Sequence, residues 1–63
     1  MGLRIRDLRE ARFLTQADLA KRAGVGVVTI SRLERDLGIA RFTTIRKLAE
    51  ALGVEPAELV VRE

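Results

Sequence analysis

The amino-acid sequence predicts an all-α fold, a compact orthogonal bundle of five helices in a single domain over residues 1–63. Three observations predict it. Apolar side chains recur every three or four residues, Gly and Pro separate the recurring stretches, and no stretch alternates as a strand does. A chain of 63 residues is long enough for one small domain with a modest core. Helices joined by such short turns pack as an orthogonal bundle.

The first helix is expected to cover about residues 3–12. The second is bounded by residues that start and stop a helix. The second follows Thr15, whose hydroxyl can cap it, and Asp18 at the third helical position completes a weaker form of the capping box. Gly24 ends the second helix, because a residue without Cβ adopts a left-handed turn easily.

The third helix begins near residue 26 or 27, with Ile30 and Leu33 on its inner side. Gly38 is the first later residue suited to end it, so we expect the helix to run on through Leu37.

The fourth helix is expected from about Phe42 to Leu52, with Gly53 at its end. A short fifth helix starts at Glu55-Pro56, since proline is favoured at the first helical position, and Leu59 folds back onto the core. The inner positions of the fourth helix are Ile45, Leu48, Ala49 and Leu52.

Composition excludes several kinds of site. The chain has no Cys and no His, so it forms no disulfide, zinc finger, or thiol- or imidazole-based catalytic group. No apolar run approaches the roughly 18 residues that a membrane span needs, and no signal peptide is visible. The carboxylates form no paired arrangement with a nucleophile or base. We therefore expect no metal, no cofactor, no membrane partner and no enzymatic activity.

Basic charge is unevenly distributed along the chain. The totals are 12 Lys and Arg against 9 Asp and Glu, a net charge of +3. Residues 1–48 hold 11 bases and 5 acids, whereas residues 49–63 hold 1 base and 4 acids. A polyanion-binding face requires such a concentration of bases, although a solvated arginine-rich surface fits the charge equally well.

The strongest pattern is the spacing within residues 16–35. Ala20 is small where two crossing helices would meet, and Gly24 permits the sharp turn between them. Apolar residues occupy the other positions that two helices crossing at roughly 90–120° would bury: Leu19, Ala23, Val25, Ile30 and Leu33. The alternative is a two-helix corner whose apolar spacing matches by chance. The ordered matches favour a helix-turn-helix unit.

The sequence resembles the phage-repressor and Cro-like (Xre-type) helix-turn-helix domains over nearly its whole length. The matching stretches are residues 8–12, 14–20, 24–25, 29–34 and 44–54. The resemblance implies a lambda-repressor-like five-helix fold, binding of double-stranded DNA at an operator, and frequent dimers.

A helical wheel of the third helix, the expected recognition helix, gives it an outer face. Val28, Arg32 and Arg35 lie opposite the apolar side, with Ser31 beside them. Arg32 can bind guanine through two hydrogen bonds, while Val27 and Val28 can pack against thymine methyl groups. The alternative is an exposed helical surface without a ligand.

The resemblance implies further DNA contacts around the recognition helix. Gln16 matches a residue that binds a DNA phosphate and often braces a side chain where Val27 stands, so that brace is in question here. Arg41, Thr43 and Thr44 enter the fourth helix, which in the family approaches the DNA backbone; the alternative is that the threonines cap the helix and Arg41 is solvated. The expected DNA-contacting set is Thr15, Gln16, Gly26, Val27, Val28, Ser31, Arg32, Arg35, Arg41 and Thr43.

Arg9 and Glu34 are expected to serve structure. Glu34 falls about 40° from Ile30 on the wheel, close to the core, and a buried charge needs a partner. The resemblance implies that Arg9 pairs with Glu34 between the first and third helices. We expect this salt bridge and no catalytic role.

The chain departs from the family where two turn glycines usually stand. Phe13 and Asp36 occupy these positions, and because a bulky residue in a left-handed turn is costly, we expect the first or third helix to end differently. Ile39 and Phe42 are expected to seal the core. For Phe13 and Leu37, core packing and an exposed dimer contact remain equal alternatives.

Two functions fit the sequence. The first is a repressor-like transcriptional regulator that occupies an operator, working in the cytoplasm at the nucleoid as a homodimer, at least on DNA. The second is a protein-interaction module, such as an antitoxin or adaptor with a toxin-like partner. The lack of a hydroxyl at Gly26 and the valines that follow it give this alternative weight.

Overall fold

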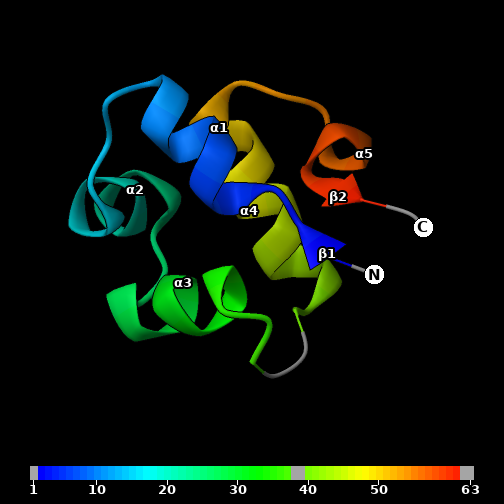
Figure 1. Cartoon of the computed structure of the whole chain (residues 1–63), viewed down its shortest axis with the longest axis horizontal. Coiled ribbons are helices and arrows are strands. Elements are labelled where there is room, and N and C mark those ends of the chain that lie inside the picture. Colours follow the sequence, from blue (N-terminus) through cyan, green and yellow to red (C-terminus); the bar gives the residue numbers. More distant parts are fainter. Residues whose placement is uncertain (1, 38–39, 62–63) are drawn as a thin grey trace.

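The computed structural model describes residues 2–37 and 40–61, which form five helices and two very short strands (Figure 1). In chain order these elements are β1 (Gly2–Leu3), α1 (Ile5–Ala11), α2 (Gln16–Ala23), α3 (Val27–Glu34), α4 (Phe42–Leu52), α5 (Pro56–Leu59) and β2 (Val60–Val61). The expected five-helix bundle is therefore confirmed. Within the described residues, no helix is long and apolar enough to cross a bilayer.

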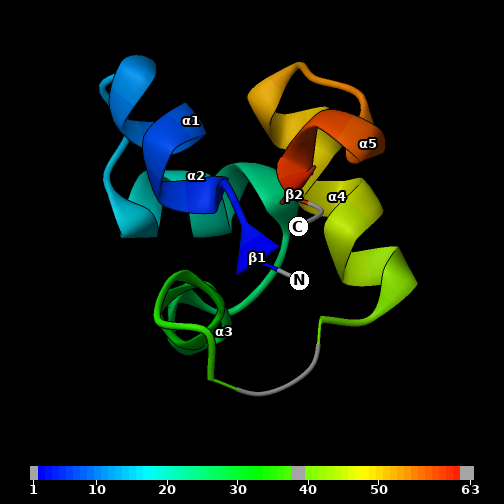
Figure 2. The ribbon, with the colours of Figure 1, turned by 45° about the vertical axis from the view of Figure 1, so that its right-hand side comes forward.

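The helices pack around one small apolar core. α4 packs against α1, α2 and α5, while α3 packs against α1 and α2, as the two ribbon views show (Figures 1 and 2). The buried residues come from all five helices: Ile5, Leu19, Ala20, Ile30, Leu33, Leu48, Ala49, Leu52 and Leu59. α2, α3 and α4 each bury an apolar stripe, as the spacing of the sequence predicts, while α1 and α5 each bury one large residue.

Two very short strands, for which the sequence shows no alternating pattern, pair at the two ends of the described fold. β1 pairs with β2 in antiparallel register, with Leu3 opposite Val60. The Arg4 backbone N–H then donates to the Leu59 carbonyl oxygen at 2.8 Å. Because this pairing uses residues 2 and 3, α1 begins at Ile5 rather than near residue 3. A ladder of two residues is too short to show the alternation that marks a strand in sequence.

The start and end of α2 follow the sequence. The Thr15 side chain accepts a hydrogen bond from the Asp18 backbone N–H at 3.0 Å, and the Asp18 carboxylate accepts one from the Thr15 backbone N–H at 3.0 Å. This completes the expected capping box. Gly24 ends the helix at φ 69°, in the left-handed region.

The expected extension of α3 through Leu37 is wrong, because the helix ends at Glu34. Asp36 adopts φ 56°, and the Leu37 backbone N–H donates to the Arg32 carbonyl oxygen at 2.8 Å. Gly38 lies outside the described residues. The chain thus closes α3 with the left-handed turn that a glycine usually makes, and an Asp side chain tolerates this conformation better than most.

α1 ends in the same way. Phe13 adopts φ 56°, and the Leu14 backbone N–H donates to the Arg9 carbonyl oxygen at 3.1 Å. The expectation that a bulky residue would change one of these two helix ends is therefore wrong. The backbone hydrogen bonds of the turn hold Phe13 in a conformation that its side chain disfavours.

α4 and α5 have the expected bounds, but one expected core residue does not enter the core. Phe42 is 71% exposed, because the first residue of α4 points away from the buried stripe. Phe13 is 94% exposed and Leu37 is 48% exposed. Ile39 lies outside the described residues. The α1–α2 connection, which holds Phe13, and the segment after α3, which holds Leu37, are separated in both ribbon views (Figures 1 and 2).

Candidate nucleic-acid interface

The corner between α2 and α3 sets the direction of α3. Gly24 turns the chain without a Cβ, and the Val25 backbone N–H donates to the Ala20 carbonyl oxygen at 3.1 Å. No neighbouring atom would meet a Cβ at Gly24, so the positive φ, and not crowding, explains the glycine. Ala20 and Ile30 are buried on the facing sides of the two helices. The corner therefore holds α3 in one orientation.

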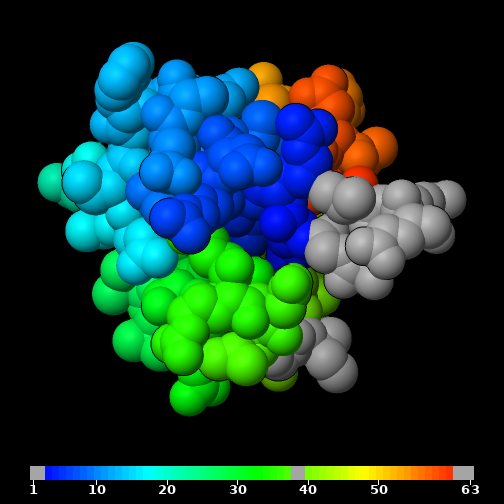
Figure 3. Space-filling model, viewed as in Figure 1, coloured from blue at the N-terminus to red at the C-terminus, as the bar shows by residue number. Residues whose placement is uncertain are grey.

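The outer face of α3 is open to solvent. Val28 is 62% exposed and Val27 is 42% exposed, and the side chains of Arg32 and Arg35 are also exposed. Ser31 beside them is half-buried. Figure 3 shows α3 (green) at the molecular surface along the lower edge of this view. The structure thus leaves free the apolar and cationic groups that a recognition helix needs.

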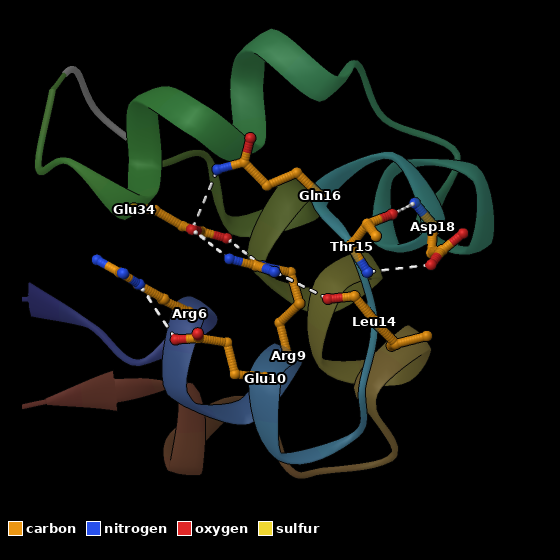
Figure 4. Close-up of polar contacts among 8 residues, drawn as sticks. All are labelled: Arg6, Arg9, Glu10, Leu14, Thr15, Gln16, Asp18 and Glu34. Atoms are coloured by element: carbon orange, nitrogen blue, oxygen red, sulfur yellow. Dashed lines mark hydrogen bonds and ion pairs between the residues drawn. The ribbon is translucent and has the colours of Figure 1, made fainter.

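A polar network fixes α3 against α1 (Figure 4). The Arg9 guanidinium donates from Nε to Glu34 Oε2 at 2.8 Å and from Nη2 to Glu34 Oε1 at 3.1 Å. Its Nη1 donates to the Leu14 carbonyl oxygen at 2.8 Å. The side chains of Arg9 and Glu34 are 13% and 5% exposed. Planar two-point pairing of this kind is the strongest geometry for an Arg–carboxylate contact.

Gln16 extends this network to the first residue of α2. Its Nε2 donates to Glu34 Oε1 at 3.2 Å (Figure 4), and Gln16 is half-buried. Glu34 therefore joins α1, α2 and α3 through a single carboxylate.

The network keeps its charges at neutral pH. The hydrogen bond to Glu34 raises the pKa of Arg9 above its usual value. Burial by itself would raise the pKa of Glu34, but the hydrogen bonds from Arg9 and Gln16 hold that pKa below its usual value. The hydrogen bonds with Thr15 lower the pKa of Asp18. Glu34 is thus a carboxylate, able only to accept hydrogen bonds.

A groove of about 390 Å³ separates α3 from the start of α4. Arg32 and Arg41 both line it, so the structure brings these two predicted residues to one place. Its remaining walls are Thr29, Leu33, Leu37, Ala40 and Thr44. The lining thus includes two arginines and two threonines beside three apolar residues, and guanidinium and hydroxyl donors suit the oxygens of a nucleic-acid backbone.

The remaining predicted residues are more scattered. Thr15 is exposed, and its hydroxyl is engaged in the capping box. Gly26 caps α3 through its backbone alone, with no side-chain hydrogen bond. Thr43 lines a separate shallow groove with Arg46, Lys47 and Glu50. The alternative in which the threonines cap α4 is wrong, because the cap residue is Arg41, whose side chain makes no capping hydrogen bond.

Residues 5–59 match the model of the family described as helix-turn-helix. The chain belongs to the helix-turn-helix family. The match covers all five helices, from the first residue of α1 to the last residue of α5.

Two curated proteins are similar to this chain over part of their length. It is 46% identical over 54 residues to the HTH-type transcriptional repressor RghR of Bacillus subtilis, covering 84% of this chain and 40% of RghR. It is 42% identical over 55 residues to HigA2 of Mycobacterium tuberculosis, a protein named as an antitoxin, covering 86% of this chain and 54% of HigA2. The chain spans about half the length of these relatives.

A solved structure resembles most of this fold. The restriction-modification controller protein C.AhdI from Aeromonas hydrophila superposes with a TM-score of 0.87 at 38% identity, over 90% of this chain and 86% of C.AhdI. The arrangement of the five helices is thus shared with a protein of nearly the same length.

Two features of the site were missed in the sequence. Thr29 joins Arg32 in the groove, and the signal was present, because the two residues are three positions apart on one helix. The contact between Gln16 and Glu34 had no sequence signal, since the residues are 18 positions apart and lie on different helices.

Proposed function

We propose that this helix-turn-helix protein binds double-stranded DNA by inserting α3 into the major groove, and that it regulates transcription by occupying an operator. The observation that carries the proposal is the exposed face of Val28, Arg32 and Arg35 on a helix whose opposite side is buried. The relative RghR is named as a transcriptional repressor, which supports the regulatory role.

Contacts of three kinds follow from this docking. Arg32 can bind the O6 and N7 atoms of a guanine, and Val27 and Val28 can pack against thymine methyl groups. Arg41 and Gln16 lie at the margins of α3, where phosphate oxygens pass. The apolar contacts and the guanidinium contact determine sequence, whereas the phosphate contacts determine register and most of the salt dependence.

The dimensions of the fold limit one copy to one major-groove segment, so reading a twofold operator requires a homodimer on DNA. The longest extent of the protein is 28 Å. Successive major-groove segments on one side of B-form DNA are about 34 Å apart, so one copy can engage only one of them with its α3. Two copies related by a twofold axis would read two half-sites about one turn apart.

Selection from random duplex DNA, followed by fluorescence anisotropy at rising salt, tests the proposal. We expect a selected motif and an affinity that falls steeply with salt through release of counterions. Arg35→Ala should weaken binding, while Arg12→Ala serves as the control, because it removes the same charge from an exposed residue outside the predicted DNA-contacting set. Equal loss for both variants would indicate attraction by net charge alone.

A protein partner is the second candidate function, favoured by the similarity to HigA2, which is named as an antitoxin. Gly26 offers no side-chain donor to DNA, and Val27 and Val28 suit an apolar protein surface as well as thymine. Stoichiometric capture of a toxin-like protein, together with no DNA binding at low salt, would favour this function over the first.

We infer a binding role and not a catalytic one, supported by the family and by the engagement of Arg9, Glu34 and Asp18 in structural contacts. A DNA-binding role implies a cytoplasmic, nucleoid-associated location.

A further inference from the structure

The amide of Gln16 has only one orientation that its surroundings accept. A carboxylate accepts hydrogen bonds and donates none, so Glu34 can face the NH₂ group of Gln16 but not its carbonyl oxygen. The structure has this arrangement, with Nε2 of Gln16 3.2 Å from Oε1 of Glu34. The same nitrogen carries a second N–H, which the contact with Glu34 does not use.

Arg9 keeps Glu34 in place and balances its charge. Both oxygens of Glu34 accept from Arg9, at 2.8 and 3.1 Å, and the pair is largely buried. Because the pair is neutral as a unit, its carboxylate can lie next to Gln16 without repelling an anion that approaches Gln16 from the solvent side. Hydrogen bonds from Arg9 and Gln16 also keep the carboxylate ionised.

We propose that Glu34 is a positioning residue for DNA binding, because it fixes the Gln16 amide so that one nitrogen bridges the Glu34 carboxylate and a DNA phosphate. The proposal rests on the DNA-binding function proposed above. It assigns Glu34 a role beyond the pairing of α1 with α3, since without it the Gln16 amide could turn its carbonyl oxygen toward the phosphate and be repelled.

A set of four proteins tests this coupling: wild type, Gln16→Ala, the double variant Arg9→Met with Glu34→Leu, and the triple variant. The double variant replaces the buried ion pair with apolar side chains of similar size, an exchange that folded proteins commonly tolerate. Cooperative thermal unfolding and an unchanged helical circular dichroism spectrum establish that each variant is folded. Binding is measured by anisotropy with a mixed-sequence duplex of about 20 base pairs at about 50 mM salt, because phosphate contacts do not depend on sequence.

The expected result is non-additive. Gln16→Ala weakens wild-type binding about tenfold, as expected for loss of a hydrogen bond to a charged group. In the background without Glu34, the same substitution changes binding by less than about twofold, because the amide is no longer oriented. The salt dependence of binding changes little in either step, since Gln16 is neutral and displaces no counterion by charge.

Glu34→Gln provides a second variant that keeps Arg9 and does not depend on tolerance of the apolar pair. A glutamine at position 34 cannot accept from all three N–H donors that Glu34 now accepts, so the side-chain NH₂ signals of Gln16 should shift and broaden in the NMR spectrum of the free protein.

The outcomes separate the inference from the function on which it rests. If wild type binds the duplex and Gln16→Ala weakens binding by the same factor with and without Glu34, the positioning role is wrong and the DNA-binding function stands. Unchanged Gln16 NH₂ signals in Glu34→Gln would also overturn it. If wild type fails to bind any duplex at low salt, both the function and the positioning role are overturned.

Discussion

Phe13 and Asp36 share a positive backbone φ of 56°, just after the ends of two helices that pack against each other. In each case the following residue donates its backbone N–H back to the helix, from Leu14 to Arg9 at 3.1 Å and from Leu37 to Arg32 at 2.8 Å. Residues 2–37 and 40–61 therefore contain two left-handed turns made without glycine.

Phe13→Gly should stabilise the protein. Relief of the left-handed strain is worth roughly 1–2 kcal/mol, and the added chain entropy of glycine costs roughly 0.5–1 kcal/mol. The ring is 94% exposed, so little packing is lost. We expect a net gain of about 0.5–1 kcal/mol, measured as a rise of several degrees in Tm. Asp36→Gly should gain less, because Asp tolerates this region.

Phe13→Ala is the control for this prediction, since it removes the ring and keeps a Cβ at the strained position. Its Tm should stay near that of wild type. A large loss of Tm in Phe13→Ala would show that the ring makes a stabilising contact, and would contradict the assignment of the effect to the backbone.

Breaking the Arg9–Glu34 pair should be costly, whereas replacing both partners should not. Arg9→Met alone leaves a buried carboxylate without its cation, which costs about 3–5 kcal/mol. Arg9→Met combined with Glu34→Leu should recover most of this loss, because no charge is left buried. Urea unfolding of Arg9→Met, Glu34→Leu and the double variant measures the free energy of unfolding of each. A double variant as unstable as the single ones would contradict this account.

The pair also predicts how stability depends on pH. The pKa of Glu34 is lower in the folded protein than its ordinary value of 4.5, so its contribution to stability is present above that pH and disappears as pH falls below it. The pKa of Asp18 is also lowered in the folded protein, so its contribution to stability likewise disappears at low pH. The stability advantage of wild type over Glu34→Gln should therefore shrink between neutral pH and pH 3 in thermal unfolding. An advantage that stays constant with pH would exclude Glu34 as a source of acid sensitivity.

Arg32→Ala should relax the preference for one base pair. A bidentate Arg–guanine contact discriminates by roughly 1–3 kcal/mol, so the selected motif should lose information at one position in each half-site while the fold is kept. The side chain is exposed, and its removal should change Tm little. Selection from random duplexes measures the change. Equal weakening on every sequence would assign Arg32 to the DNA backbone.

Local signals were enough to predict most of the fold. Thr15 with Asp18, Gly24 and Pro56 act on the nearest turn of backbone, so their effects could be inferred without knowing the tertiary structure. The outward face of α3 could be predicted as well, because helical spacing alone separates Arg32 from the buried stripe.

The features that were missed depend on distant parts of the chain or on competition between effects. The pairing of residues 2–3 with residues 60–61 joins the two ends of the fold, and nothing near either end requires it. The strain at Phe13 is a cost that backbone hydrogen bonds outweigh, and sequence shows only the cost. Phe42 was assigned to the core from its hydrophobicity, although its place at the start of α4 faces it outward.

The register of β1 and β2 determines how the fold would respond to tension. Gly2 lies opposite Val61 in the antiparallel ladder. A force that pulls residues 2 and 61 apart therefore loads this pair before it loads Leu3 and Val60. Such a force peels the strands apart one pair at a time, instead of shearing all their hydrogen bonds together. The helices would be loaded only after the ladder had opened, so the ladder of residues 2–3 and 60–61 would be the first part of the fold to separate under such a force.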